Sequence, residues 1–166
     1  SQKAILFAGT VRSNIAYGDN GRDDFTDEVV KNAIATAQAA EFVEQIEDGY
    51  DGRVAQGGDN FSGGQKQRLS IARAVARRPE IFIFDDSFSA LDYKTDRVLR
   101  DTLNRECGDA TRFIVAQRIG TIRDADKIIV LDEGRIVGMG RHEELIKTCE
   151  VYQQIALSQL SKEELA

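Results

Sequence analysis

The residues most able to do chemistry lie between Phe61 and Asp92. Ser62, Gly63 and Gly64 begin a predicted helix, and their lack of bulky side chains lets backbone N–H groups approach an anion closely. The positive end of the helix dipole points to the same place. This stretch therefore predicts a binding site for a phosphate group or another anion.

A pair of carboxylates follows this helix. Residues 81–84 are four apolar residues without alternation, which is typical of a strand covered on both faces. Asp85 and Asp86 come directly after them, at the carboxyl end of the strand, where open α/β sheets bind their ligands. Carboxylates can hold a divalent metal ion. The sequence thus predicts an anion site and a metal-competent carboxylate pair on one short segment.

The helix between these two features has a clear apolar side. Four small or aliphatic residues recur at helical spacing and predict one buried face: Leu69, Ala72, Val75 and Ala76. Pro79 lies just beyond the last turn, where a helix should stop. We therefore expect a helix from the glycines to about residue 78, followed by the strand.

Further elements are predicted on both sides of this segment. Thr26 is a candidate N-cap for a helix with an apolar stripe from Val29 to Ala37. The other predicted elements are a short helix at 42–46 ending in a turn at 48–51, a helix near 98–103, a buried strand at 113–116, a hairpin of strands 128–131 and 135–137, and helices at 141–147 and 152–160. The alternation of helices and strands predicts an α/β protein.

Composition excludes several classes of protein. The net charge is −6, which gives no support for a nucleic-acid partner. No apolar run approaches the ~20 residues that span a bilayer, and the first residues show no signal-peptide pattern. Cys107 and Cys149 lack the spacing of a metal site, and we interpret them as reduced thiols of a cytosolic chain.

Three motifs in this order resemble those of the nucleotide-binding domain of ABC transporters. Phe61–Gln65 resembles the LSGGQ signature, Ile81–Asp85 the Walker B strand, and Ser89–Asp92 the D-loop. Each motif alone has an ordinary explanation as a turn, a core helix or a core strand, but their conjunction at this spacing makes chance improbable. The resemblance covers essentially the whole chain.

The resemblance implies an α/β fold, namely the C-terminal part of a P-loop NTPase (RecA-like) domain with an α-helical signature subdomain. Residues 1–78 would form the Q-loop and the α-helical subdomain, and residues 79–166 the RecA-like portion with Walker B, D-loop and switch loop. The sequence contains no G-x-x-x-x-G-K-[ST] motif. We therefore expect the Walker A half to be absent, the chain to begin just after it, and the chain alone to be inactive.

The resemblance also implies ATP and Mg²⁺ as cofactors and assigns roles to individual residues. Gln2 would be the Q-loop glutamine that contacts the metal and the attacking water, and Asp85 would hold Mg²⁺ through water. Asp92 would orient the facing ATP site. The residues implied to bind the ATP of a partner domain are Ser62, Gly63, Gly64 and Gln65.

Two positions depart from the family pattern. Asp86 stands where the family usually has the general-base glutamate, and its side chain is shorter by about 1.5 Å. A base must lie within roughly 2.6–3.2 Å of its proton or act through one water. Gln117 stands where the switch-loop histidine is expected, and the only histidine, His142, follows the predicted hairpin. Together these changes predict a degenerate ATP site that binds nucleotide and hydrolyses it poorly.

A chain with an intact signature and an altered ATP site of its own resembles one subunit of a heterodimeric, multidrug-type ABC exporter. Such a protein couples ATP binding and hydrolysis to the export of substrates such as drugs or lipids. The implied partners are a second, non-identical nucleotide-binding domain and transmembrane domains, at the cytoplasmic face of the cell membrane. Leu6 and Phe7 would contact the transmembrane domains, and the alternative is that they form a core strand or turn.

Two other functions stay open. The chain could be a non-catalytic fragment that acts only as a dimerisation module, or a head of the chromosome-organising (SMC-type) or repair ATPases. The second alternative predicts sustained heptads, which the sequence lacks, and the exporter-like stretch Gln2–Tyr17 argues against it.

Overall fold

The computed structural model describes residues 3–18 and 25–163. Contacts divide the chain into two compact units, Ser1–Val115 and Ala116–Ala166. The mixed α/β fold that the sequence predicts is confirmed. Within the described ranges, no helix is both long and apolar enough to cross a membrane. The subdomain boundary between residues 78 and 79 stays a prediction.

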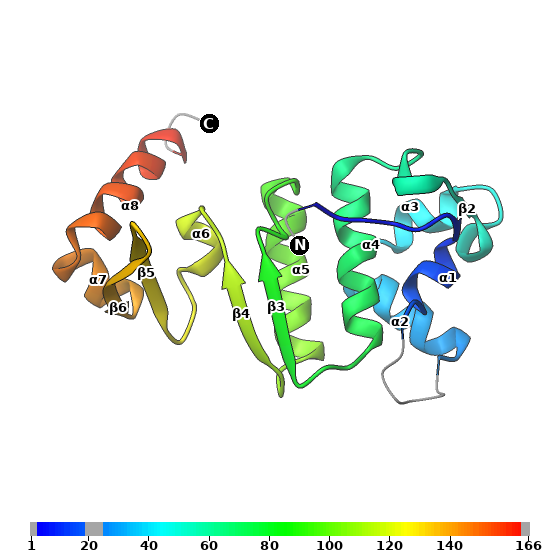
Figure 1. The fold of residues 1–166 in the computed structure, drawn as a ribbon, viewed down its shortest axis with the longest axis horizontal. Helices are drawn as coiled ribbons and strands as arrows, with labels where there is room; N and C mark the ends of the chain where they lie inside the picture. The colour runs from blue at the N-terminus through cyan, green and yellow to red at the C-terminus, as the bar shows by residue number, and fades with distance from the viewer. Residues whose placement is uncertain (1–2, 19–24, 164–166) are drawn as a thin grey trace. The chain divides into compact units, whose positions relative to one another are not determined.

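The first unit combines helices with two small sheets (Figure 1). Its elements are β1 (Gly9–Thr10), α1 (Val11–Ile15), α2 (Asp27–Thr36), α3 (Ala40–Gln45), the 3₁₀ helix η1 (Gly49–Asp51), β2 (Arg53–Val54), the 3₁₀ helix η2 (Gln56–Gly58), α4 (Gly63–Ala76), β3 (Ile81–Asp85), α5 (Tyr93–Glu106) and β4 (Thr111–Val115). The predicted helix after the glycines and the strand before the two aspartates are therefore both present.

Local sequence explains where the helices begin. The Thr26 hydroxyl accepts a hydrogen bond from the Val29 N–H at 3.4 Å and caps α2, as predicted. Helix α2 then packs against α4 and α5. The core between these elements includes Ile34 of α2, Leu69 of α4 and Leu99 of α5, all fully buried. Burial of such aliphatic side chains stabilises the unit by about 1.5–3 kcal/mol each.

Strands β3 and β4 are parallel neighbours in direct register, with Ile83 opposite Phe113 and Asp85 opposite Val115 (Figure 1). Phe82 and Phe84 point into the core, as period-two geometry requires. The other face is open, because Ile83 is 71% exposed.

The expectation that this strand is covered on both faces is therefore wrong within the described residues. Phe113 and Val115 of β4 are exposed as well, so the same correction applies to the predicted buried strand at 113–116. Within the described residues only one face of this sheet is buried, although the run lacks the alternation of apolar and polar residues that is typical of such a sheet.

The second unit contains α6 (Ile119–Ile122), β5 (Ile128–Asp132), β6 (Arg135–Gly140), α7 (His142–Thr148) and α8 (Glu150–Glu163). β5 and β6 form the predicted antiparallel hairpin. Glu133 and Gly134 at its turn both have positive φ, 45° and 76°, as two-residue hairpin turns commonly require. Its small core comprises Ile128, Val130, Leu145, Cys149 and Tyr152.

Candidate functional site

The glycine turn, Ser62–Gln65, forms the N-terminus of the 14-residue helix α4. A reciprocal capping box fixes its conformation: the Gln65 N–H donates to the Ser62 hydroxyl at 3.3 Å, and the Ser62 N–H donates to the Gln65 side-chain oxygen at 2.8 Å. Phe61, directly before the turn, is buried in the core. The turn is thus held in place by bonds and packing of this chain.

This geometry leaves hydrogen-bond donors for an anion. In the described part of the chain, the N–H groups of Gly63 and Gly64 have no acceptor, as expected for the first turn of a helix. The Ser62 hydroxyl accepts from Gln65, which leaves its proton available to donate. Both glycines and Ser62 are at least partly exposed. These donors fit a phosphate group of the kind that ATP carries.

A loop from another part of the chain packs on the glycine turn. A Cβ added to Gly64 would lie 3.1 Å from the carbonyl oxygen of Ala90 and 3.6 Å from Cδ2 of Leu91. Because the first of these atoms is backbone, any side chain at position 64 would press on the loop. The loop at residues 86–91 and the glycine turn therefore pack closely against each other.

The carboxylate pair lies at the end of β3. The Asp86 N–H donates to the carbonyl of Val115 at 2.9 Å, which extends the parallel ladder by one bond. Asp86 itself adopts φ +49°, a left-handed conformation that aspartate tolerates better than most residues. Both aspartates are half-buried, and within the described ranges neither carboxylate accepts a hydrogen bond from the protein.

The described residues offer few side-chain ligands for a Mg²⁺ ion. Among the described residues, no three His, Cys, Asp or Glu side chains cluster as a metal site. Mg²⁺ is nevertheless commonly held by one or two carboxylates together with phosphate oxygens and water. Asp85, at the carboxyl end of a strand, fits that mode.

Asp92 ends the loop and caps the next helix. Its carboxylate accepts a hydrogen bond from the Thr95 N–H at 2.9 Å at the start of α5. This backbone bond holds the pKa of the Asp92 carboxyl below its usual range. A helix-capping role is therefore visible in the structure, beside the role predicted for Asp92 toward a facing ATP site.

Comparison with known proteins identifies the family. Residues 2–89, more than half of the chain, match the family model described as ABC transporter. The chain belongs to the ABC transporter family. An uncharacterized ABC transporter ATP-binding protein of Mycobacterium bovis is 49% identical over 158 residues, which cover 95% of this chain and 27% of that protein.

More distant relatives are named as exporters or flippases. An ATP-dependent lipid A-core flippase of Desulfotalea psychrophila is 41% identical, covering 92% of this chain and 26% of the flippase. A bacterial Atm1-family ABC exporter, solved with ATP bound, superposes with a TM-score of 0.89 at 37% identity, covering 95% of this chain and 27% of the exporter. This ABC family chain thus spans about a quarter of the length of these relatives.

The structure brings together most, but not all, of the predicted site residues. The glycine turn, Asp85, Asp86 and Asp92 all belong to the first compact unit. Gln117 belongs to the second unit, where its backbone carbonyl accepts a hydrogen bond from the Gln159 side chain at 2.6 Å. Gln2 lies outside the described residues.

The N-terminal segment presents an aromatic patch that the sequence located only in part. Leu6, predicted to contact a membrane partner, is 1% exposed and belongs to the core. Phe7 is exposed and stacks on the exposed ring of Tyr17, with centroids 4.2 Å apart. The Arg73 guanidinium lies 5.2 Å from the Phe7 ring centre and donates to the carbonyls of Ile5 and Asn14. Of the two alternatives that the sequence left open, Leu6 thus takes the core position, and only Phe7 lies at the surface.

The residue that sequence reasoning missed is Gln67 of α4. It is only 7% exposed, and both ends of its amide are bonded to the backbone of the loop at residues 86–91. A signal was present, because Gln67 is four residues before the buried Ile71 and so shares its helix face. A polar side chain on the apolar face of a helix indicates a specific role when it makes buried hydrogen bonds. Only the structure shows that Gln67 makes them.

Proposed function

We propose that this chain is a portion of the ATP-binding domain of an ABC exporter, and that its glycine turn completes the ATP site of a partner domain. The observation that carries the proposal is the capped N-terminus of α4, with two unpaired glycine N–H groups and an available Ser62 proton in the described part of the chain. These donors would face the γ-phosphate of the partner's nucleotide. Similarity to exporter ATP-binding proteins supports this role.

The chain's own carboxylates would serve a second ATP site. ATP supplies the transferable phosphoryl group, and Mg²⁺ neutralises the charge that develops on it. Asp85 would hold the ion through water, Gln2 would contact the metal and the attacking water, and Asp92 would help to orient the facing site. Two residues, Asp86 and Gln117, replace the usual glutamate and histidine, so we propose that this own site hydrolyses ATP poorly.

The proposal extends to partners and location. This chain would combine an intact signature with an ATP site of low activity. That combination favours a second ATP-binding domain that is non-identical and carries the missing glutamate and histidine. The exposed pair Phe7 and Tyr17 would contact transmembrane domains, and the chain would then lie at the cytoplasmic face of the cell membrane. The names of the relatives, which include lipid A-core flippases, support an exporter.

We also propose that the 166-residue chain alone neither binds ATP tightly nor hydrolyses it. The sequence has no G-x-x-x-x-G-K-[ST] motif, and such a loop supplies most of the phosphate donors and the phosphate-binding lysine. Isothermal titration of the chain with ATP and Mg²⁺ should show no saturable heat. Binding in the micromolar range would contradict this expectation.

One experiment separates the two ATP sites. In the assembled transporter, Gly64→Asp places a carboxylate where a phosphate must bind and presses on the Ala90 carbonyl, so steady-state ATP turnover should be lost. Removal of a single preorganised donor already costs on the order of 10²–10³ in rate. Asp86→Asn is the matched variant, because asparagine also tolerates positive φ, and it should change turnover little. If Asp86→Asn abolished turnover while Gly64→Asp left it intact, this chain would own the working site.

A further inference from the structure

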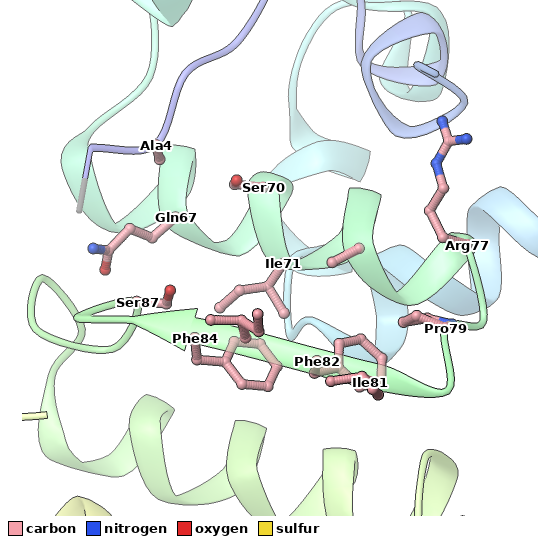
Figure 2. Close-up of a pocket in the computed structure, with 12 residues that line it drawn as sticks. Ala4, Gln67, Ser70, Ile71, Arg77, Pro79, Ile81, Phe82, Phe84 and Ser87 are labelled. Carbon is pink, nitrogen blue, oxygen red and sulfur yellow. The ribbon is translucent and has the colours of Figure 1, made fainter. Parts of the chain in front are cut away.

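The side chain of Gln67 connects two functional segments of the first unit. It lies on α4, one turn after the glycine turn, and extends toward the end of β3 at one end of a cavity of about 340 Å³ (Figure 2). The cavity is otherwise lined largely by apolar side chains such as Ile71, Phe82 and Phe84. A buried amide in these surroundings has to satisfy its donor and its acceptor locally.

Both groups are satisfied by the backbone of the loop at residues 86–91. The amide nitrogen of Gln67 donates to the carbonyl of Asp86 at 3.4 Å, and its oxygen accepts from the N–H of Ala90 at 3.2 Å. The Asp86 carbonyl also accepts from the Ser89 hydroxyl at 3.0 Å. One planar amide therefore bonds the backbone of the loop at both ends, at Asp86 just after β3 and at Ala90, which packs on Gly64.

The loop is attached to the glycine turn by packing as well as by this amide. A Cβ added to Gly64 would lie only 3.1 Å from the Ala90 carbonyl oxygen, so the loop packs closely against the start of α4. Helix α4 is a continuous 14-residue element that carries both Gln67 and the glycine turn. A displacement of Asp86 would thus reach the donors of the glycine turn through a rigid helix and two backbone contacts.

We propose that Gln67 is a positioning residue that couples nucleotide occupancy of this chain's own carboxylate site to the glycine turn offered to the partner's nucleotide. The inference rests on the proposed function of the glycine turn. Both amide atoms hold backbone atoms of the loop. Coupling between two sites of this kind typically changes affinity by roughly 5–150-fold.

The test is the ATP dependence of turnover in the assembled transporter. The parent should show a Hill coefficient above one, since occupancy of one site promotes the other. Gln67→Leu removes donor and acceptor, and the Hill coefficient should fall to one. Gln67→Glu keeps the shape and the acceptor for Ala90 but loses the donor to Asp86, so it should lower the coefficient even if the leucine variant folds poorly.

Gln38→Leu is the matched control. Gln38 also bridges two elements through its amide, which donates to the Thr102 hydroxyl at 3.2 Å and to the Ala35 carbonyl at 3.3 Å, but it does not contact the loop at 86–91. Its loss should lower stability and leave the Hill coefficient at the parent value. A merely structural role of Gln67 would likewise reduce the folded fraction and the maximal rate, with an unchanged coefficient.

The outcomes distinguish this inference from the function on which it rests. A parent coefficient of one, or Gln67 variants that keep the parent's cooperativity, overturns the coupling role. If Gly64→Asp abolishes turnover in the same preparations, the proposed function survives that result. If Gly64→Asp leaves turnover intact, the proposed function itself is wrong.

Discussion

The glycine turn and the carboxylate end of β3 lie in the same compact unit but differ in how they are held. The glycine turn is fixed by a reciprocal capping box, by the buried ring of Phe61 and by contact with Ala90. The carboxylate end has an exposed sheet face beside it, and within the described residues its two carboxylates lack hydrogen-bond donors. In the part of the chain that the structure describes, side-chain hydrogen bonds thus hold the glycine turn, and none holds the two carboxylates.

The difference indicates which function the chain can perform as it stands. An anion site made of backbone N–H groups forms once the helix is capped, because its donors belong to the helix itself. A hydrolytic site needs a base at a defined distance from its water, a metal and further phosphate donors. Under the proposed function, the glycine turn would be ready to bind a partner's nucleotide, whereas the carboxylate end would need further groups to hydrolyse ATP.

The largest expected effect is a gain of activity at the carboxylate end. Asp86→Glu combined with Gln117→His, in the complete subunit, should raise ATP turnover at its own site by roughly 10²–10⁴-fold, the usual contribution of a general base. The longer side chain restores reach, although glutamate is less suited than aspartate to φ +49°. Single-turnover measurements of phosphate release would show the gain.

The double variant needs a control for unspecific effects of the new residues. Asp86→Asn with Gln117→His restores the histidine without a base and should remain near the parent rate. If the Glu–His variant showed no acceleration, this chain's own ATP site would lack more than these two groups. The carboxylate end would then differ from the glycine turn even more than proposed.

The next effect concerns the strand that supports the carboxylates. Phe84 is buried against the core, and Phe84→Ala should lower the free energy of unfolding of this chain by about 3–5 kcal/mol. Ile83, the adjacent residue on the open face, is the matched control, and Ile83→Ala should change it by no more than about 0.5 kcal/mol. Urea unfolding would measure both. Equal losses would mean that the face is covered, and the one-sided description of β3 would be wrong.

The smallest expected effect is a pH dependence of helix capping. The folded-state pKa of Asp92 lies below its unfolded value of about 3.9, so its stabilising bond to Thr95 is fully present above that pH and is lost as the pH falls through the folded-state pKa. The stability difference between the parent and Asp92→Asn should therefore be present at pH 7 and vanish in strong acid. Urea titrations at the two pH values would measure it.

Ser62 provides the neutral comparison for Asp92. Its hydroxyl caps α4 without carrying a charge, so Ser62→Ala should lower stability by a similar amount at both pH values. If the effect of Asp92→Asn were equally independent of pH, the carboxylate of Asp92 would not act as a charged cap.

Features that depend on neighbours in sequence were predicted from the sequence. Thr26 caps α2, and Glu133 and Gly134 lie at the turn of the predicted hairpin, because a helix start or a tight turn is decided by a few adjacent dihedrals and hydrogen bonds. The order of the glycine turn, helix, strand and paired aspartates also identified the family correctly.

Features that depend on distant contacts were decided only by the tertiary structure. The sequence left open whether Leu6 lies at the surface or in the core, and packing buries it. The sequence predicted β3 to be covered on both faces, but Ile83 is exposed. The bonds of Gln67 to the loop at 86–91 span 19 and 23 residues, and the approach of Ala90 to Gly64 is equally non-local. Hydrophobic periodicity in the sequence predicts that a residue is packed against other atoms. Only the three-dimensional fold determines which atoms it contacts.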